Sequence, residues 1–255
     1  MSHRGVALAM LIIAGIAASL GCCCPVPGPI VQPPPIVIQE QPLIVQGPDL
    51  AAQRAEELKK VIAQNLGPNK EAGTLAANNT FWARLKTKLA KRQFHGTELV
   101  GPGARVNPTF TDTGPEAGVL IGVFACQDDG GFQGVCYLQP IFLTAQGEKV
   151  GTGYGAASAL PVQCLKAKAG YAVGGIKMRA GAAIDQIQLV YVKVDGEKLN
   201  LADQYLSPSV GGDGGGPMEV FSKGVLVIGV HGTRADGPGF SAPGSATSLG
   251  LLLLQ

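Results

Sequence analysis

The sequence EAGVLIGV at residues 116–123 returns twice along the chain in altered form, and this repetition decides the fold. It recurs as KAGYAVGGI at residues 168–176 and as KGVLVIGV at residues 223–230. Aligning the copies on Gly122, Gly174 and Gly229 gives intervals of 52 and 55 residues. A turn and a second apolar run follow each copy, at residues 135–142, 184–194 and 249–254. Three long units of paired strands predict a closed threefold β body rather than an open array of short repeats.

Composition narrows the classes of protein to which the chain can belong. Of 255 residues, 37 are Gly and 18 are Pro, while 15% are charged and 46% are hydrophobic. The apolar content is too high and the net charge of +2 too low for a disordered polyelectrolyte. Gly shows no three-residue period, which excludes collagen, and Gly and Pro at this density oppose a mainly helical bundle. We therefore expect an all-β main domain with a short α-helical N-terminal segment.

Residues 1–21 have the features of an export signal peptide. A short basic start precedes a 15-residue apolar run, Val6–Leu20, which suits a signal and is short for a membrane span. Gly21 before Cys22 resembles the bacterial lipobox, in which removal of the signal leaves a lipidated N-terminal cysteine. We expect a lipoprotein anchored in a membrane of the cell envelope through Cys22. Ordinary cleavage with secretion, and a retained anchor helix, are the alternatives.

Residues 22–48 are predicted to be a Pro-rich linker. Eight of the 18 Pro lie between residues 25 and 48, where Glu40 is the one charged residue. Pro restricts φ and removes a backbone donor, so we expect an extended polyproline II segment that holds the following domain away from a membrane. A ligand for a polyproline-binding partner is the alternative.

Residues 49–99 form the helical segment in this scheme. Asp49 can cap a helix with apolar positions at helical spacing as far as Leu66, and Gly67-Pro68 ends it. A second helix is expected over residues 72–92, with Trp82, Leu85 and Leu89 on one side. Cations on a neighbouring face could contact anionic lipid or nucleic acid. We favour a solvated face near a helix C-terminus, and we expect no nucleic-acid partner.

Over about residues 115–255, within the main domain of residues 100–255, the chain resembles a known lectin family in several places. The stretch Gly170–Ile187 resembles the strand, turn and strand of jacalin-related lectins. Val227–Gly232 and the run Gly211–Gly216 resemble two further segments of that family. The same pieces are similar to a group of uncharacterised exported, Gly-rich proteins of planctomycete type. The resemblance implies a threefold β-prism with Greek-key sheets over residues 100–255.

The resemblance also implies a sugar site made of a Gly-rich loop and a Gly-x-x-x-Asp turn. Gly181 and Asp185 keep that spacing in the second unit. In the third unit Gly232 and Asp236 keep it, but they lie early in an expanded loop. Before the last strand, where an Asp is expected, the sequence has Ser248-Leu249 instead. Asp185 could instead orient its own turn. The candidate ligand-binding residues are Gly181, Asp185, Gly211, Gly212, Asp213, Gly232 and Asp236. The implied function is a non-catalytic binding module for carbohydrate or a surface polymer. A structural or protein-interaction role without sugar binding is the alternative.

The remaining Cys and His residues suggest no enzyme. Cys126 and Cys136 flank a turn and could form a disulfide across a hairpin. Cys164 is expected to be a small buried apolar residue, and its pairing with His231 as a thiol dyad is the weaker alternative. The sequence has no zinc-type spacing of His or Cys and no phosphate-binding loop. We therefore expect no catalytic residue, no metal and no cofactor.

Overall fold

The computed structural model describes residues 48–67, 79–102, 109–131, 133–235 and 243–255. All of them belong to one compact unit, Gln46–Gln255. The predicted signal peptide, the lipidated Cys22 and the Pro-rich linker lie outside the described residues, apart from Pro48. Within the described residues, no helix is long and apolar enough to cross a membrane.

Two helices occur where the apolar spacing predicts them. Helix α1 spans Pro48–Asn65 and helix α3 spans Asn79–Ala90. The expected start of the second helix, residues 72–78, lies outside the described residues. Trp82 and Leu85 are buried as predicted, together with Phe81, and Leu89 is half-buried.

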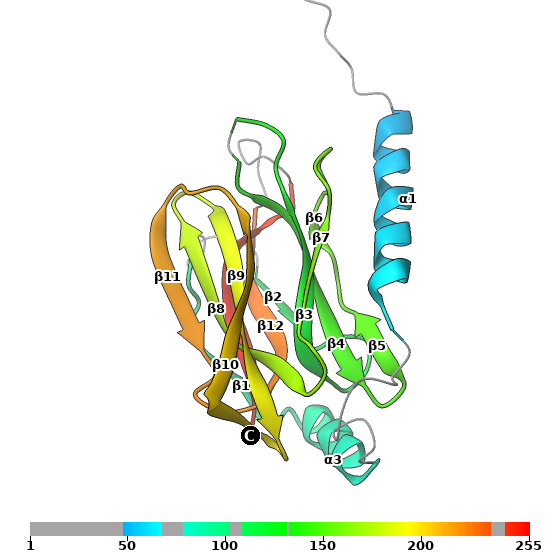
Figure 1. Cartoon of the computed structure of the whole chain (residues 1–255), viewed down its shortest axis with the longest axis vertical. Helices are drawn as coiled ribbons and strands as arrows, with labels where there is room; N and C mark the ends of the chain where they lie inside the picture. The colour runs from blue at the N-terminus through cyan, green and yellow to red at the C-terminus, as the bar shows by residue number, and fades with distance from the viewer. Residues whose placement is uncertain (1–47, 68–78, 103–108, 132, 236–242) are drawn as a thin grey trace, which may run out of the picture. The chain divides into compact units, whose positions relative to one another are not determined.

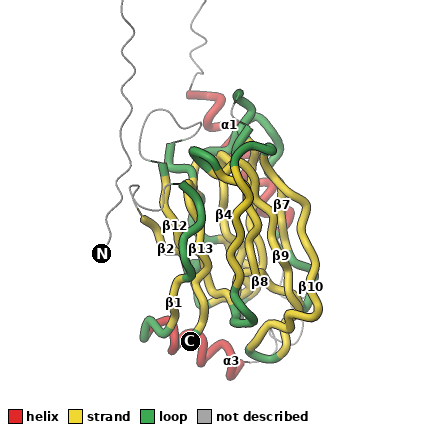
Figure 2. Tube along the Cα trace, turned by 90° about the vertical axis from the view of Figure 1, so that its left-hand side faces the viewer, coloured by secondary structure: helices red, strands yellow, loops and turns green. Residues whose placement is uncertain are grey.

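Three antiparallel sheets make up the rest of the unit (Figures 1 and 2). Sheet I has the strand order β5 (Gly147–Val150), β4 (Val135–Thr144), β3 (Gly118–Gln127) and β7 (Gln163–Lys166), with β6 (Tyr154–Gly155) also paired to β4. Sheet II has the order β10 (Lys198–Gly211), β9 (Ile184–Asp195), β8 (Tyr171–Ala180) and β11 (Gly216–Phe221). Sheet III has the order β1 (Phe94–Gly96), β13 (Ala246–Leu254), β12 (Val227–Arg234) and β2 (Thr109–Asp112).

Each sheet is a Greek key built on one hairpin. In sheets I and II the third strand lies beside the second, and a later strand returns to lie beside the first. Sheet III has the same spatial order, but its outer strands β1 and β2 come from the opposite end of the chain. Strand β1 falls within the segment 49–99 that we expected to be helical, and it pairs with the last strand, Phe94 opposite Leu254. The three repeats of the sequence are the first strands of the three central hairpins.

The register corrects the alignment of these repeats by one residue. Each central hairpin has an irregularity at its start, after Leu120, Val173 and Val227. The residue after the bulged position is Gly122, Gly175 or Gly229, so Gly175 and not Gly174 is the equivalent glycine. The intervals between equivalent glycines become 53 and 54 residues. The units are therefore more regular than the sequence alignment indicated, because the bulge identifies the glycine that follows it, whereas matching letters could not choose between the adjacent Gly174 and Gly175.

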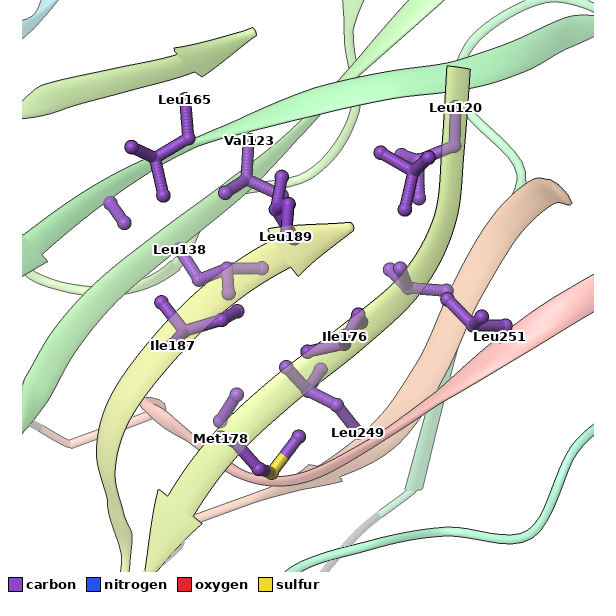
Figure 3. Packing of buried hydrophobic residues seen from close by; sticks show 14 of the residues in the cluster. Leu120, Val123, Leu138, Leu165, Ile176, Met178, Ile187, Leu189, Leu249 and Leu251 are labelled. Carbon is purple, nitrogen blue, oxygen red and sulfur yellow. The ribbon is translucent and has the colours of Figure 1, made fainter. Parts of the chain in front are cut away.

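Buried side chains form two clusters, one inside the three sheets and one outside them. The inner cluster draws on all three sheets, as Figure 3 shows for Leu120, Leu138, Ile176, Ile187 and Leu249. In the outer cluster, Phe81, Trp82 and Leu85 of α3 and partly buried residues of α1 pack with outward-facing strand residues. Alternation along the strands explains the division, since successive side chains point to opposite faces.

Polar contacts also attach the helices to the sheets. The Lys166 ammonium donates to the Asn65 carbonyl at 2.7 Å, and the Gly67 amide donates to the Glu148 carboxylate at 2.8 Å. On α3, Arg84 forms an ion pair with Glu197, and Lys88 donates to the Gln255 carbonyl. Two of the cations on this helix therefore contact the protein itself, so the face is only in part the solvated one that we expected.

Candidate functional site

The Gly181–Asp185 turn joins β8 to β9. Ala180 pairs with Ile184 and Arg179 pairs with Gln186, so Asp185 has no partner in the register and sits at an irregularity. The Gly181 amide donates to the Ala183 carbonyl at 3.0 Å and closes the turn. This irregularity turns the Asp185 side chain out of the usual alternation.

The Gly-rich loop between β10 and β11 lies against this turn. The Gly212 amide donates to the Asp185 carbonyl at 2.9 Å. A Cβ at Gly211 would lie under 3.0 Å from that same carbonyl, and one at Gly215 would lie 2.5 Å from Asp185 Oδ2. Both glycines also have positive φ, 108° and 58°. Only glycine allows the loop to approach this closely, so the structure brings together the residues that the sequence predicts in the second unit.

The Asp185 carboxylate is buried beneath the loop without a complete set of partners. Asp185 is 6% exposed, and its Oδ2 has no hydrogen-bond partner. Leaving a buried acceptor unsatisfied costs about 1–3 kcal/mol, and more for a charged group. The backbone carbonyl of Asp185, rather than its carboxylate, holds the neighbouring chain. This oxygen therefore keeps an unused capacity to accept a hydrogen bond.

Two residues that sequence reasoning missed complete the surroundings of the loop. Arg179 on β8 donates to the carbonyls of Asp213, Gly214 and Gly215 at 2.7–2.9 Å. Gln133, which has a φ of 53°, approaches Gly212 from the turn between β3 and β4. A Cβ at Gly212 would lie 3.2 Å from the Gln133 Cβ. Neither residue carried a sequence signal, because both contacts join segments that are distant in the chain.

A groove on the outer face of sheet II begins beside the site. Its volume is about 510 Å³, and Arg179 and Gln186 line it together with Lys177, Gln188 and Glu219. The Gln186 amide also donates to the Gly212 carbonyl at 3.1 Å. Polar side chains therefore extend from the glycine loop along the sheet.

The other two hairpins have different residues where Asp185 stands. In each hairpin, one residue of the second strand has no partner directly after the first pair that follows the turn. This residue is Cys136 in sheet I, Asp185 in sheet II and Thr247 in sheet III. The equivalent in the third unit is therefore Thr247 and not Ser248. The buried Thr247 hydroxyl lies 2.9 Å from the Thr233 hydroxyl, which in turn lies 2.6 Å from that of Ser248. At this position only sheet II has a carboxylate.

The candidate residues of the third unit are not brought together as a site. Gly232 lies within β12, paired with both Leu249 and Phe110, and it is buried. The expanded loop thus begins after Arg234 rather than at Gly232, because β12 continues its pairing further than the turn residues suggested. Asp236 lies outside the described residues. In the Gly-rich loop of sheet II, Asp213 is exposed and contributes its carbonyl to Arg179.

Cys126 and Cys136 lie side by side as free thiols. The Cys136 thiol donates to the Cys126 carbonyl at 3.3 Å, and the Ser158 hydroxyl lies 3.2 Å from Cys126 Sγ. A hydrogen bond from Cys136, aided by Ser158, lowers the pKa of Cys126 to about 6 against the opposing effect of burial. The same interaction raises the pKa of Cys136. The disulfide between these residues stays a prediction.

Cys164 and His231 occupy different sheets. Cys164 lies in β7 opposite Phe124, and burial raises its pKa. His231 lies in β12, where Gly250 of the neighbouring strand β13 and Gly96 of β1, the next strand beyond it, make room for its imidazole. No contact between the two residues supports a dyad. Among the described residues, no group of three or more His, Cys, Asp or Glu could hold a metal ion.

His231 should make the stability of the protein depend on pH. Burial lowers the pKa of His231 below its ordinary value of 6.5, and Nε2 has no hydrogen-bond partner. Between the folded and unfolded pKa values the unfolded chain binds more protons, so the free energy of unfolding should fall as the pH drops through about 6.5. Urea unfolding from about pH 8 to about pH 5 measures this. In His231→Asn the free energy of unfolding should depend less on pH, and in the control His95→Asn it should depend on pH as in the wild type. Equal pH dependence in all three proteins would show that His231 is not the group responsible.

Comparisons with known proteins give structural likenesses only. No protein-family model and no curated protein matches the sequence significantly. Malaysian banana lectin is similar in structure, with 12% identity and a TM-score of 0.44 over 63% of this chain and 98% of that one. Frutapin, a lectin from Artocarpus incisa, has 11% identity and a TM-score of 0.44 over 64% and 98%. A mannose-binding jacalin-related lectin from Ananas comosus has 11% identity and a TM-score of 0.43 over 64% and 98%.

Proposed function

We propose that the protein is a non-catalytic carbohydrate-binding module whose site is formed by Asp185 and the Gly-rich loop 211–216. One observation carries the proposal: Asp185 Oδ2 is buried, without a partner, beneath a loop that only glycine could form. A sugar hydroxyl that donates to this oxygen would satisfy it. Loop amides could donate to the same or a neighbouring hydroxyl, as the resemblance to jacalin-related lectins implies.

The arrangement favours hydroxyl groups over a metal cation. A cation such as Ca²⁺ needs six to eight oxygen ligands. Here Arg179 already occupies the carbonyls of Asp213, Gly214 and Gly215. What remains is a carboxylate acceptor beside backbone donors, which suits a group that both donates and accepts. A hydroxyl has this property and a cation does not.

The groove beside the site favours a chain of sugars over a single ring. At about 510 Å³ it has the size of a small-ligand site, and its amide and charged side chains can bond hydroxyls. On sheet I, by contrast, Lys166 and Glu148 bind the backbone at the end of helix α1. We therefore expect oligosaccharides or a surface polymer to bind better than free monosaccharides.

A glycan array tests this function. Wild-type protein should bind a defined set of glycans, and Asp185→Ala should lose them all. Asp195→Ala is a matched control, because Asp195 is an exposed carboxylate at the opposite end of the same strand. Absence of binding by the wild type, or equal binding by Asp185→Ala, would favour the alternative of a structural or protein-interaction role.

We further propose that the module is displayed at the bacterial cell envelope through a lipid on Cys22. The support is the sequence: a signal-like apolar run, Gly21 before Cys22, and a Pro-rich spacer as far as residue 48. At about 3.1 Å per residue, such a spacer would reach on the order of 70–80 Å in polyproline II form.

Mass spectrometry of the mature N-terminus tests the anchor. We expect the chain to begin at Cys22 with a diacylglycerol mass increment, and Cys22→Ser should leave the signal uncleaved. Cys23→Ser is the matched control and should be processed normally. A mature chain that begins elsewhere, or an unmodified Cys22, would overturn the lipoprotein assignment.

A further inference from the structure

One guanidinium holds three consecutive carbonyls of the Gly-rich loop. Arg179 Nε donates to the Asp213 carbonyl at 2.8 Å and to the Gly214 carbonyl at 2.9 Å. Its Nη2 donates to the Gly215 carbonyl at 2.7 Å. The loop therefore curves around the guanidinium, and a planar fork with fixed donor directions suits this role better than a flexible ammonium.

The Asp185 carboxylate approaches the loop as well. Cβ atoms at Gly214 and Gly215 would lie 2.8 Å from Asp185 Oδ1 and 2.5 Å from Oδ2. The backbone at these glycines thus contacts both Arg179 and Asp185. A loop with so many glycines has high conformational entropy, and without external bonds it would not keep one shape.

The peptide geometry decides where the loop amides point. In a trans peptide the carbonyl and the following N–H point in opposite directions. Since the carbonyls of residues 213–215 point to Arg179, the N–H groups of Gly214, Gly215 and Gly216 point away from it. Those three amides are the donors that a ligand beside Asp185 would need.

We propose that Arg179 is a positioning residue that orders the Gly-rich loop so that its amides are directed to the ligand of Asp185. The proposal rests on the proposed function for its ligand, although the ordering of the loop can be measured without one. Arg179 itself acts through the loop and need not touch the sugar. Lys193 provides the control, because it lies on strand β9 of the same sheet, outside the groove, and forms an exposed ion pair with Asp203.

Backbone ¹⁵N relaxation of the free protein tests the ordering. In the wild type the order parameters of residues 213–216 should be close to those of a rigid backbone, about 0.85, and in Arg179→Met they should fall below about 0.6, because three bonds to the loop are lost. Lys193→Met should leave these order parameters unchanged, and those of the central hairpins should be equal in all variants. Unchanged order parameters of the loop in Arg179→Met would overturn the proposal.

Glycan affinity tests the consequence for binding. Using the best glycan of the array, Arg179→Met should bind on the order of tenfold to a hundredfold more weakly, since the donors are no longer held in place. Arg179→Lys should recover only part of the affinity. An ammonium can still donate to a loop carbonyl, but it cannot reach all three carbonyls at once. Equal affinity of Arg179→Met and Lys193→Met would overturn the proposal. If the wild type binds no glycan, the proposed function fails, whereas the relaxation experiment still decides whether Arg179 orders the loop.

Discussion

Replacing Gly122 or Gly229 by alanine should leave the protein largely unfolded. A Cβ at Gly122 would lie under 3.0 Å from the Leu165 carbonyl oxygen, and one at Gly229 equally close to the Asp112 carbonyl oxygen. Both carbonyls belong to the backbone of the strand that completes the Greek key, so they cannot move without breaking its pairing. Overpacking alone costs 1–3 kcal/mol, and a rigid backbone clash should cost roughly 3 kcal/mol or more. That is a large part of the stability of an ordinary domain.

The equivalent glycine of the second unit should be less sensitive. A Cβ at Gly175 would meet the ring of Phe221 first, and that side chain is exposed enough to move. Gly131, where a Cβ meets nothing within 4 Å, is the control. Circular dichroism with urea unfolding should therefore show the smallest loss of stability for Gly131→Ala and a larger loss for Gly175→Ala. The largest losses should occur in Gly122→Ala and Gly229→Ala. Near-native stability of Gly122→Ala or Gly229→Ala would show that the close approach of these strands is not required.

Replacing Asp185 by asparagine should weaken glycan binding strongly and leave the protein as stable as before, or more so. A buried carboxylate oxygen without a partner opposes folding, and removing its charge removes that cost. The same oxygen is the proposed acceptor for the ligand. Since hydrogen bonds to a charged group contribute about 1.5–3 kcal/mol each, the loss of affinity should be on the order of a hundredfold. Isothermal titration with the best glycan and thermal unfolding measure the two effects.

Asp112 offers the opposite case in the same protein. It is also buried, but its carboxylate accepts from the amides of Gly114 and Thr152, both at 2.7 Å. Asp112→Asn puts an amide donor against one of these donors and should therefore lower the melting temperature clearly. Equal destabilisation by Asp185→Asn and Asp112→Asn would mean that Asp185 is a structural residue that orients its own turn, as one reading of the sequence allowed.

The sequence predicted the elements of the fold well because their signals are local. Apolar residues at helical spacing marked α1 and α3, and Gly and Asp between β-branched runs marked the central hairpins. The Gly181–Asp185 turn and the Gly211–Gly216 loop were likewise recognised from residues next to one another. The same reasoning failed for Gly232, because a glycine within a strand and a glycine in a turn look alike when the pairing is unknown.

What the sequence by itself determined is the threefold repetition of hairpins and the presence of two Gly-x-x-x-Asp spacings, at Gly181 and at Gly232. Only the tertiary structure decided which residues are equivalent. The bulge that identifies Gly175, rather than Gly174, as the equivalent glycine is a property of the strand pairing. It also decided that the turn and the glycine loop meet, and that Arg179 holds that loop. These contacts join residues up to 36 positions apart in the chain. Their energy depends on distance in space, which no local pattern of residues records.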